Sequence, residues 1–304
     1  MTGFANSQNL FFCAIIDTMN IKYLGEKMYI SDAKHFRIDE TLDCGQTFRW
    51  RRDAKGFYGV ALGKKVRAEQ HGDNITIYGA GLGEGWENYF DLNRDYGAIK
   101  KHYSKDEFLK QGMEYAGGIR VLRQPEFETL ISFIISANNN VKRIMGIVEK
   151  VCKKYGNKID EDVYDFPTPT QLASATEEEL VECGAGYRAA YILKTARMIE
   201  SGFPLLELRA MPYEEARVKL NELSGVGMKV ADCMCLYSLS FMQSFPADVW
   251  MKRVLCGAYG YTGKNDKTMR EFIDNEFGEH AGIAQQYLFH YARHNPETVC
   301  KVGE

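Results

Sequence analysis

The sequence lacks a long hydrophobic run. Its N-terminal apolar stretch, Leu10 to Ile16, is seven residues long, whereas a helix that spans a bilayer needs about 20 apolar residues. Residues 1–9 contain no lysine or arginine, so the basic start of a secretory signal peptide is also missing. We therefore expect no membrane association. We interpret residues 1–27 as an N-terminal extension or the product of an upstream start codon, and assign them no function.

The chain also lacks a compact cysteine framework. Its eight cysteines are scattered over 304 residues, which argues against a disulfide scaffold and favours reduced thiols inside a cell. Cys233 and Cys235 would point in two directions from a helix, so they are a poor metal pair. His290 and His294 share a helical face but have no further ligand nearby. We therefore predict no metal site.

An excess of basic charge is missing as well. The formal net charge is −3 and the sequence pI is about 6.1, which does not favour a nucleic-acid binder. One basic face is nevertheless enough for phosphate contact. Basic residues do gather at Lys142-Arg143, Arg188 and Lys252-Arg253, although such groups are more often solvated surface than a binding patch.

The first third of the chain has strand-like patterns. Between Tyr29 and Gly79, short aromatic or β-branched runs alternate with turn residues, which predicts an antiparallel sheet. The runs are 47–50, 57–61 and 75–78, and the turns are 53–56, 63–65 and 71–74. Residues 81–115 form an acidic and aromatic bridge, with 91–95 as a turn or helix cap.

Helical patterns dominate after Gln124. Pro125 precedes an almost wholly apolar run, which predicts a buried central helix over 125–135. Further helices are expected over 141–155, 170–182, 187–201, 213–223, 228–239, 249–259, 267–278 and 281–293. We predict an α+β fold: an N-terminal antiparallel β-sheet domain (28–115) packed on a larger all-helical body (116–304), with the site in a cleft between helical lobes.

The segment from Leu223 to Cys233 (LSGVGMKVADC) carries the most specific signal. Gly225 and Gly227 bracket Val226, so the backbone can turn tightly and approach a ligand closely. A helix should follow at once, and its first unpaired amides suit a phosphate. A Gly-x-Gly pair before a helix is common, however, and alone it is weak evidence for DNA contact.

Lys229 lies in the first turn of that expected helix. The positive end of the helix dipole disfavours a cation there, and a neutral lysine amine is a nucleophile that forms Schiff bases. Cys233 follows four residues later on the same face. Asp248 lies nineteen residues beyond the lysine, just after Pro246. Taken alone, Lys229 is most simply a solvated charge and Asp248 the N-cap of a helix.

The combination resembles the helix-hairpin-helix glycosylase superfamily, whose signature is this hairpin followed by a Gly/Pro-rich loop and an aspartate. A lysine at position 229 is similar to the bifunctional members, which cleave both base and strand. Other segments between about Ile38 and Arg293 resemble motifs of the 8-oxoguanine DNA glycosylases: CGQTFRW (44–50), GGIRVLRQ (117–124), SANNNVKR (136–143), GAGYRA (184–189) and AGIAQQYLF (281–289).

The resemblance implies a way to recognise the opposite base. An enzyme that acts on a base in duplex DNA must extrude that base and fill the gap. Asn138 is similar to the residue that the family inserts into the stack, although three asparagines in a row can also simply cap and turn a chain. Arg143 and Arg188 match the arginines that hold the widowed cytosine, and Tyr187 matches the tyrosine beside it. We expect a preference for cytosine opposite the lesion.

The resemblance also implies a pocket for the damaged base. The carbonyl of Gly45 would accept the N7 proton that 8-oxoguanine has and guanine lacks, and glycine lets the backbone come close. Gln285 is similar to the glutamine that reads the pairing edge. Phe289, one helical turn on, would stack on one face of the base and Cys233 on the other. Without the resemblance, core packing explains Phe289 equally well.

The implied mechanism uses Lys229 and Asp248. The lysine amine attacks C1′ of the sugar, the aspartate stabilises the positive charge that develops there, and the base leaves. The resulting Schiff base acidifies a C2′ proton, so strand scission by β-elimination follows. Catalysis needs no cofactor, although the carbonyls of the Gly225–Gly227 hairpin could hold a structural cation beside a DNA phosphate.

Two departures from the wider family matter. Many relatives carry an iron–sulfur loop of four closely spaced cysteines near the C-terminus, but here Cys300 stands alone, so we predict no cluster. Trp250 occupies a position where many eukaryotic members have a histidine that contacts a phosphate. Tryptophan has one ring donor and cannot be cationic, which puts that contact in doubt.

The sequence therefore predicts a bifunctional glycosylase and abasic-site lyase that excises 8-oxoguanine from duplex DNA during base excision repair. We expect it to act on damaged double-stranded DNA as a monomer, in the cytoplasm or nucleoid of a prokaryote. One alternative is a glycosylase for other damaged bases; Lys229 and the missing cysteine loop argue against alkylpurine and oxidised-pyrimidine members respectively. A second alternative is a non-catalytic helix-hairpin-helix protein that only binds DNA.

Overall fold

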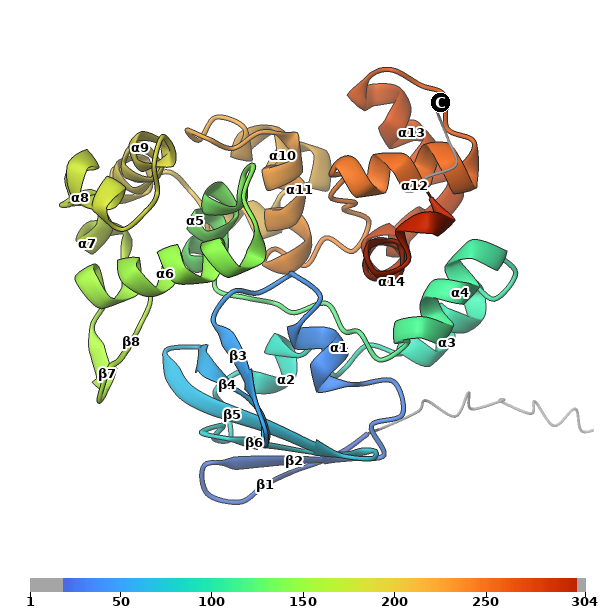
Figure 1. Cartoon of the computed structure of the whole chain (residues 1–304), viewed down its shortest axis with the longest axis horizontal. Coiled ribbons are helices and arrows are strands. Elements are labelled where there is room, and N and C mark those ends of the chain that lie inside the picture. Colours follow the sequence, from blue (N-terminus) through green and yellow to red (C-terminus); the bar gives the residue numbers. More distant parts are fainter. Residues whose placement is uncertain (1–18, 300–304) are drawn as a thin grey trace, which may run out of the picture.

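The computed structural model describes residues 19–299. A six-stranded antiparallel sheet forms one part, and a larger body of helices covers it (Figure 1). This is the predicted α+β architecture. Residues 1–18 and 300–304 lie outside the described part, so most of the expected N-terminal extension and Cys300 are not placed.

The sheet has the strand order β1-β2-β6-β5-β4-β3. Tight turns join most of the neighbouring strands, as expected from the Gly and Asp residues between them. The strands are β1 (Asn20–Tyr23), β2 (Lys27–Ser31), β3 (Trp50–Asp53), β4 (Gly56–Ala61), β5 (Lys64–His71) and β6 (Asn74–Tyr78).

The strands differ from the sequence-based expectation in three ways. β1 pairs with β2 from Asn20 opposite Ser31 to Tyr23 opposite Met28, so the sheet begins before residue 28. β5 starts at Lys64, inside a segment expected as a turn, because Val66 and Ala68 are buried while their charged neighbours face outward. β3 starts at Trp50 rather than at Thr47, because the preceding residues turn into the helical body.

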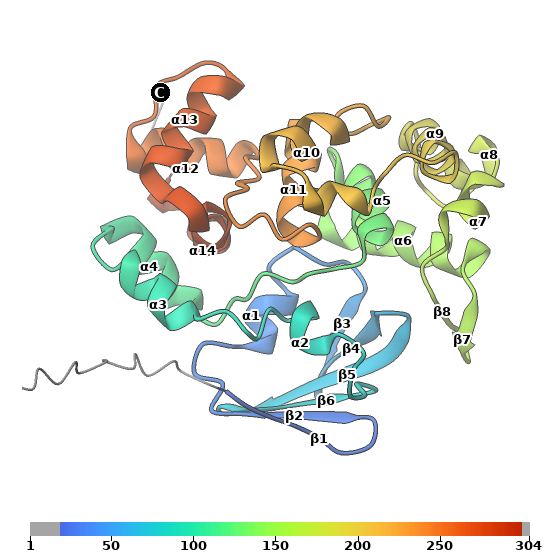
Figure 2. The ribbon, with the colours of Figure 1, turned by 180° about the vertical axis from the view of Figure 1, so that it is seen from behind.

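The expected bridge over 81–115 is mainly helical. Asp95 and Asp106 cap two of its helices, since their carboxylates accept hydrogen bonds from the amides of Ala98 and Leu109. The helices around this region are α1 (Ile38–Leu42), α2 (Trp86–Tyr89), α3 (Tyr96–His102) and α4 (Glu107–Ala116). Seen from behind, α4 lies against α14 (Figure 2).

The helical body follows the predicted helices closely. The expected helix over 170–182 is divided, because Thr176 begins a new helix with a capping box to Glu179. The elements are α5 (Glu126–Ser136), α6 (Val141–Tyr155), β7 (Lys158–Asp160), β8 (Val163–Tyr164), α7 (Pro169–Ala173), α8 (Glu177–Glu182), α9 (Arg188–Glu200), α10 (Tyr213–Leu220), α11 (Met228–Tyr237), α12 (Val249–Tyr259), α13 (Asp266–Phe277) and α14 (Ala281–His294). Helix α11 lies between the α5–α9 helices and the α12–α14 helices (Figure 1).

Two buried clusters form the core, one under the sheet and a larger one in the helical body. The segment just before β3 joins them: Cys44 and Phe48 pack in the body, whereas Trp50 packs under the sheet. This segment therefore brings residue 45 to the helices.

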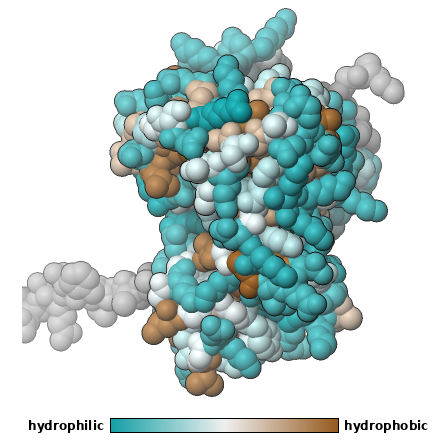
Figure 3. Space-filling view, turned by 90° about the vertical axis from the view of Figure 1, so that its left-hand side faces the viewer, coloured by the Kyte–Doolittle hydropathy of each residue, from teal (hydrophilic) through white to brown (hydrophobic). Residues whose placement is uncertain are grey.

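One side of the surface, seen in Figure 3, is mainly hydrophilic, with hydrophobic residues in separate small patches. Within residues 19–299, every helix is too short or too polar to cross a membrane.

Candidate active site

The glycine hairpin precedes α11 as predicted, and its two glycines differ. Gly225 has φ +79°, and a Cβ there would lie 2.8 Å from Cβ of Tyr191. Gly227 has an ordinary φ of −87° and is the N-cap of α11, which has no side-chain cap. A Cβ on Gly227 would meet no protein atom within 4 Å. The fold itself therefore requires glycine at 225 only, whereas position 227 offers a bare helix start to a ligand.

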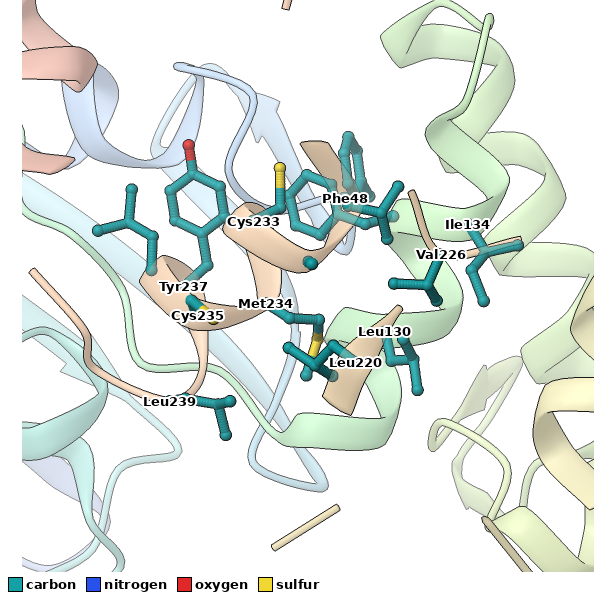
Figure 4. Packing of buried hydrophobic residues seen from close by; sticks show 14 of the residues in the cluster. Phe48, Leu130, Ile134, Leu220, Val226, Cys233, Met234, Cys235, Tyr237 and Leu239 are labelled. Carbon is teal, nitrogen blue, oxygen red and sulfur yellow. The ribbon is translucent and has the colours of Figure 1, made fainter. Parts of the chain in front are cut away.

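One face of α11 carries the predicted nucleophile. Lys229, Cys233 and Tyr237 are spaced four residues apart and so share one face of α11; Lys229 and Tyr237 both contact the ring of Phe133 on α5. The Lys229 ammonium lies 5.1 Å from the ring centroid of Phe133, and the Tyr237 ring stacks on the same ring at 5.3 Å. In Figure 4 the side chains of Cys233 and Tyr237 point to the same side of α11, away from Met234. Lys229 is half-buried on this aromatic platform.

Asp248 is the N-cap of α12. Its Oδ1 accepts a hydrogen bond from the amide of Met251 at 2.9 Å, which fixes the carboxylate at the helix start. The interpretation of Asp248 as a helix N-cap is therefore correct. A catalytic role is compatible with it, since the second carboxylate oxygen does not take part in the cap.

Cys233 lies one helical turn after Lys229 on α11, and its thiol is buried. Burial raises the pKa of this thiol to about 11; Lys229 acts in the opposite direction, and the charges of Asp232 and Asp248 add to the rise. The Cys233 side chain remains a neutral thiol at physiological pH, which suits an uncharged wall of a base pocket better than a second nucleophile.

Gly45 and Phe289 also come together. Gly45 has φ +87°, and a Cβ on it would lie 3.9 Å from Cε1 of Phe289 and 3.7 Å from Nη1 of Arg293. Phe289 is half-buried and packs against the body core, and the guanidinium of Arg293 lies 6.0 Å from its ring centroid. The sheet domain thus supplies one wall of the candidate pocket and α14 supplies another.

Gln285 lies one turn before Phe289 and is almost completely buried. Its Nε2 donates to the carbonyl of Pro246 at 3.2 Å, two residues before Asp248. Its Oε1 accepts a hydrogen bond of 2.7 Å from Nε2 of Gln286. Gln286 in turn contacts the hydroxyl of Tyr237 and the thiol of Cys44. Hydrogen bonds therefore connect the 44–45 segment, α11, α14 and the segment before Asp248.

The loop between α5 and α6 holds the residue expected to enter the DNA stack. Asn138 is exposed and has φ +48°, a conformation that asparagine tolerates better than most residues. Arg188 fixes this loop: Nε donates to the carbonyl of Ala137 at 2.8 Å and Nη2 to that of Asn138 at 2.9 Å. Nη1 donates to the carbonyl of Ala185. Arg188 is therefore buried and fixes the loop backbone.

The other predicted DNA contacts are on the surface. Tyr187 is 57% exposed and lies edge-on to Tyr191, with ring centroids 6.1 Å apart. Arg143 is exposed on the first turn of α6. Trp250 is half-buried on the first turn of α12, with the guanidinium of Arg253 5.4 Å from its ring centroid. Tyr191 therefore lies between the wedge position at 187 and the hairpin at 225.

No cluster of three or more histidine, cysteine or acidic side chains within residues 19–299 is arranged to hold a metal ion. His290 and His294 do contact each other, with ring centroids 4.4 Å apart, but Tyr115 covers the pair. These histidines form an aromatic cluster with α4.

Sequence reasoning missed four residues of this site: Phe133, Tyr191, Tyr237 and Gln286. The positions of Tyr191 and Tyr237, four residues after Tyr187 and Cys233, were a usable signal, because such spacing places side chains on one helical face. Phe133 and Gln286 carried no such signal. Phe133 contacts residues of the distant helix α11, and Gln286, besides its neighbour Gln285, contacts Cys44, which lies 242 residues away in the chain.

Two family models match the chain. Residues 28–130 match the model described as 8-oxoguanine DNA glycosylase, N-terminal domain, and residues 131–277 match the HhH-GPD superfamily base excision DNA repair protein. A protein of Methanothermobacter thermautotrophicus named "Probable N-glycosylase/DNA lyase" is 35% identical over 85% of this chain and 94% of its own length. The N-glycosylase/DNA lyase of Saccharomyces cerevisiae is 43% identical over 71% of this chain and 66% of its own.

Solved structures agree with the sequence matches. The 8-oxoguanine glycosylase/lyase of Clostridium acetobutylicum, in complex with double-stranded DNA containing cytosine opposite 8-oxoguanine, superposes with a TM-score of 0.86. It is 38% identical, and the match covers 92% of this chain and 99% of that one. The chain belongs to the HhH-GPD superfamily of base excision DNA repair proteins and carries the N-terminal domain of the 8-oxoguanine DNA glycosylases.

Proposed function

We propose that this protein is a bifunctional DNA glycosylase and abasic-site lyase that excises 8-oxoguanine from duplex DNA. Relatives that match most of the chain carry the name N-glycosylase/DNA lyase, and the Clostridium relative binds DNA with cytosine opposite 8-oxoguanine. The observation that carries the proposal is the position of Lys229, half-buried on Phe133 at the start of α11 and directly behind the glycine hairpin.

Lys229 is the proposed nucleophile. Its amine attacks C1′ of the damaged nucleotide, the bond from C1′ to the base breaks, and the base leaves with the bonding electron pair. Asp248 stabilises the positive charge that develops on the sugar, as an oriented carboxylate can. The sugar ring then opens to a Schiff base, which makes a C2′ proton acidic. Loss of that proton expels the 3′ phosphate and cleaves the strand.

The damaged base is proposed to lie between Phe289 and Cys233. Gly45 and Phe289 line one side, and the neutral thiol of Cys233 the other. The carbonyl of Gly45 accepts the N7 proton of 8-oxoguanine, and Gln285 reads the pairing edge. The two walls come from different parts of the chain, which supports a pocket that forms only when sheet domain and helical body are packed together.

The opposite base is proposed to be cytosine. Asn138 enters the stack, Tyr187 wedges beside it, and Arg143 contacts the widowed base. The exposed positions of all three support this assignment. Arg188 is proposed to contact the same cytosine; its guanidinium also donates to the carbonyls of Ala137 and Asn138 and so fixes the loop that carries Asn138.

The chemistry is proposed to need no metal and no iron–sulfur cluster, because lysine supplies the nucleophile and aspartate the charge. A structural cation at the carbonyls of the hairpin (223–227), beside a DNA phosphate, remains part of the proposal. We propose further that the protein acts as a monomer on double-stranded DNA in the reducing interior of a prokaryotic cell, at the nucleoid. The β-rich domain (28–115) and the helical domain (116–304) would then act together as one unit.

Two other functions fit less well. Glycosylases for alkylated bases share the fold: the 3-methyladenine DNA-glycosylase of Archaeoglobus fulgidus superposes with a TM-score of 0.69 at 20% identity. That likeness supports the fold alone. A protein that only binds DNA would need neither Lys229 on its aromatic platform nor a capped Asp248.

Borohydride trapping tests the proposal. The wild type and Lys229→Gln would be incubated with a duplex containing 8-oxoguanine opposite cytosine, and Lys267→Gln, on the exposed surface of α13, serves as the matched control. We expect a covalent adduct with the wild type and Lys267→Gln but not with Lys229→Gln. Released base without an adduct would indicate a monofunctional enzyme. Folded protein that neither releases base nor forms an adduct would refute the assignment to 8-oxoguanine.

A further inference from the structure

We infer that Gln286, a buried residue next to Gln285 on α14, is a positioning residue that fixes the orientation of the Gln285 amide and so sets which purine edge the pocket accepts. This inference rests on the proposed function. Gln286 is buried, and its amide contacts Gln285, Tyr237 and Cys44, so its polar atoms are already paired with protein groups. It acts through Gln285, to which it donates a hydrogen bond of 2.7 Å.

The hydrogen bonds around Gln285 have only one consistent direction. The carbonyl of Pro246 can only accept, so the group that faces it at 3.2 Å must be the Gln285 amide nitrogen. The amide oxygen of Gln285 then faces Gln286, which must donate. A flipped Gln285 amide would place two oxygens against each other at Pro246 and two NH₂ groups against each other at Gln286. Both contacts would be unfavourable in a buried site.

Gln286 is itself held from two sides. Its Nε2 also donates to the hydroxyl of Tyr237, and its Oε1 lies 3.4 Å from the thiol of Cys44. Burial raises the pKa of the Cys44 thiol to about 12 and the pKa of Tyr237 well above its ordinary value. Both groups therefore keep their protons over the physiological pH range. The single thiol proton of Cys44 has two acceptors, the carbonyl of Thr41 at 3.3 Å and Oε1 of Gln286 at 3.4 Å. The direction of the chain is therefore set by the carbonyl of Pro246 and by the donation from Gln286 to Gln285.

The fixed amide has a consequence for the substrate. Each amide oxygen can accept two hydrogen bonds and each NH₂ group can donate two, so Gln285 still offers one acceptor site and one N–H in a set arrangement. The pairing edge of guanine presents an acceptor at O6 and a donor at N1. Adenine presents the opposite pair, a donor at N6 and an acceptor at N1. A Gln285 amide that cannot rotate therefore pairs with the edge of one purine and places like groups against each other at the edge of the other purine.

The test uses two lesions that differ only at this edge. 8-Oxoguanine and 8-oxoadenine share the oxygen at C8 and the proton at N7, so the contact proposed for Gly45 is the same for both. Each lesion is placed opposite cytosine in the same duplex. Single-turnover excision rates are measured for the wild type and for Gln286→Met, which keeps the side-chain length but removes the hydrogen bonds. Dissociation constants for both duplexes are measured in the Lys229→Gln background, where no excision interferes.

A second glutamine provides the matched control. Gln124 is buried and its Nε2 donates to the carbonyl of Gln46 at 2.7 Å, but it forms no hydrogen bond with Gln285 or Gln286. Gln124→Met therefore also loses a buried amide hydrogen bond. We expect it to lower stability without changing the ratio of the two rates or of the two dissociation constants.

We expect the wild type to favour 8-oxoguanine over 8-oxoadenine at least tenfold, and Gln286→Met to reduce this ratio about fivefold to tenfold, the factor that one neutral hydrogen bond supports. A folded Gln286→Met that slows both lesions equally, or leaves the ratio unchanged, would overturn the inference. Equal rates on both lesions in the wild type would also overturn it, whether or not the variant folds. Failure of the proposed function is distinct, because the wild type would then excise no 8-oxoguanine.

Discussion

Replacement of Arg217 tests how helix α11 is held in place. Arg217 on α10 is buried, and its Nε donates to Oδ1 of Asp232 on α11 at 2.6 Å. Asp232 also accepts from the hydroxyl of Tyr213 at 3.0 Å and from Arg270 on α13 at 3.3 Å. Asp232 lies between Lys229 and Cys233 in the sequence, so this network fixes the helix that carries both.

The magnitude follows from what Arg217→Met leaves behind. Removing one partner of a buried ion pair costs about 3–5 kcal/mol, because the other charge stays buried. Here Arg270 and Tyr213 remain with Asp232, so the lower end applies. Arg217 also contacts Asp266, whose side chain is 44% exposed, and an exposed pair adds less than about 1 kcal/mol. We expect a loss of about 3 kcal/mol in the free energy of unfolding.

Urea unfolding measures this loss, with Lys219→Met as the control. Lys219 is on the same helix and pairs with Glu222 at 2.8 Å on the surface, so its replacement should cost less than about 1 kcal/mol. If Arg217→Met were no less stable than Lys219→Met, the buried network would not be what holds α11.

Three further predictions concern the hairpin, the aspartate and a histidine. Gly225→Ala should destabilise the fold, because φ is +79° and the new Cβ would collide with Tyr191. Gly227→Ala should lower the free energy of unfolding by at most about 1 kcal/mol and mainly weaken DNA binding. Equal affinities of the wild type and Gly227→Ala in a titration with duplex DNA would contradict this. Asp248→Asn retains a good N-cap, so thermal unfolding should be nearly unchanged while the excision rate falls at least about a hundredfold; a comparable loss of stability in Asp248→Asn and Asp248→Ala would contradict the separation of the two roles. Burial, with the nearby charges of His294 and Arg293, lowers the pKa of His290 from 6.5 to about 4, and Asp39 opposes the shift. Because the unfolded chain then binds the proton first, the contribution of His290 is present above pH 6.5 and is lost as the pH falls from about 6.5 to about 4; a His290→Leu variant with the same acid dependence of stability would refute this.

Much of the helical body could be predicted from the sequence, because each long helix has an apolar stripe and a clear start. The segment 81–115 could not, since its helices are short and their aromatic residues show no regular period. Only the cap expected within 91–95 is confirmed, since Asp95 begins α3; the cap at Asp106 was an equally readable signal. The break near Thr176 was also readable as a capping box to Glu179. β5 escaped notice because its buried residues, Val66 and Ala68, are small and lie between charges.

Some contacts of the candidate site could be predicted from the sequence and others could not, for a physical reason. Local contacts such as the cap at Asp248 or the turn at Gly225 depend on neighbours in the chain, and residue type reveals them. Arg188 shows the limit: the resemblance implies a contact with the opposite cytosine, but nothing in the sequence indicates that its guanidinium also binds the carbonyls of Ala137 and Asn138. A backbone carbonyl is present at every residue, so no sequence pattern can indicate which carbonyl will accept a hydrogen bond from a distant side chain.

The hydrogen bonds from Cys44 through Gln286 and Gln285 to Pro246 also explain why the sheet domain and the helical body need each other. Cys44 comes from the segment before β3 and packs in the body core, Gln285 and Gln286 are on α14, and Pro246 leads into α12. Neutral amide bonds are weak singly, but each is directional and buried, so each has only one favourable partner geometry. A displacement of the sheet domain would separate Cys44 from Gln286 and, at the same time, Gly45 from Phe289. The proposed recognition of the base by Gly45 and the orientation of Gln285 are therefore coupled to the packing of the two parts. That packing can be disturbed without changing Lys229 or Asp248.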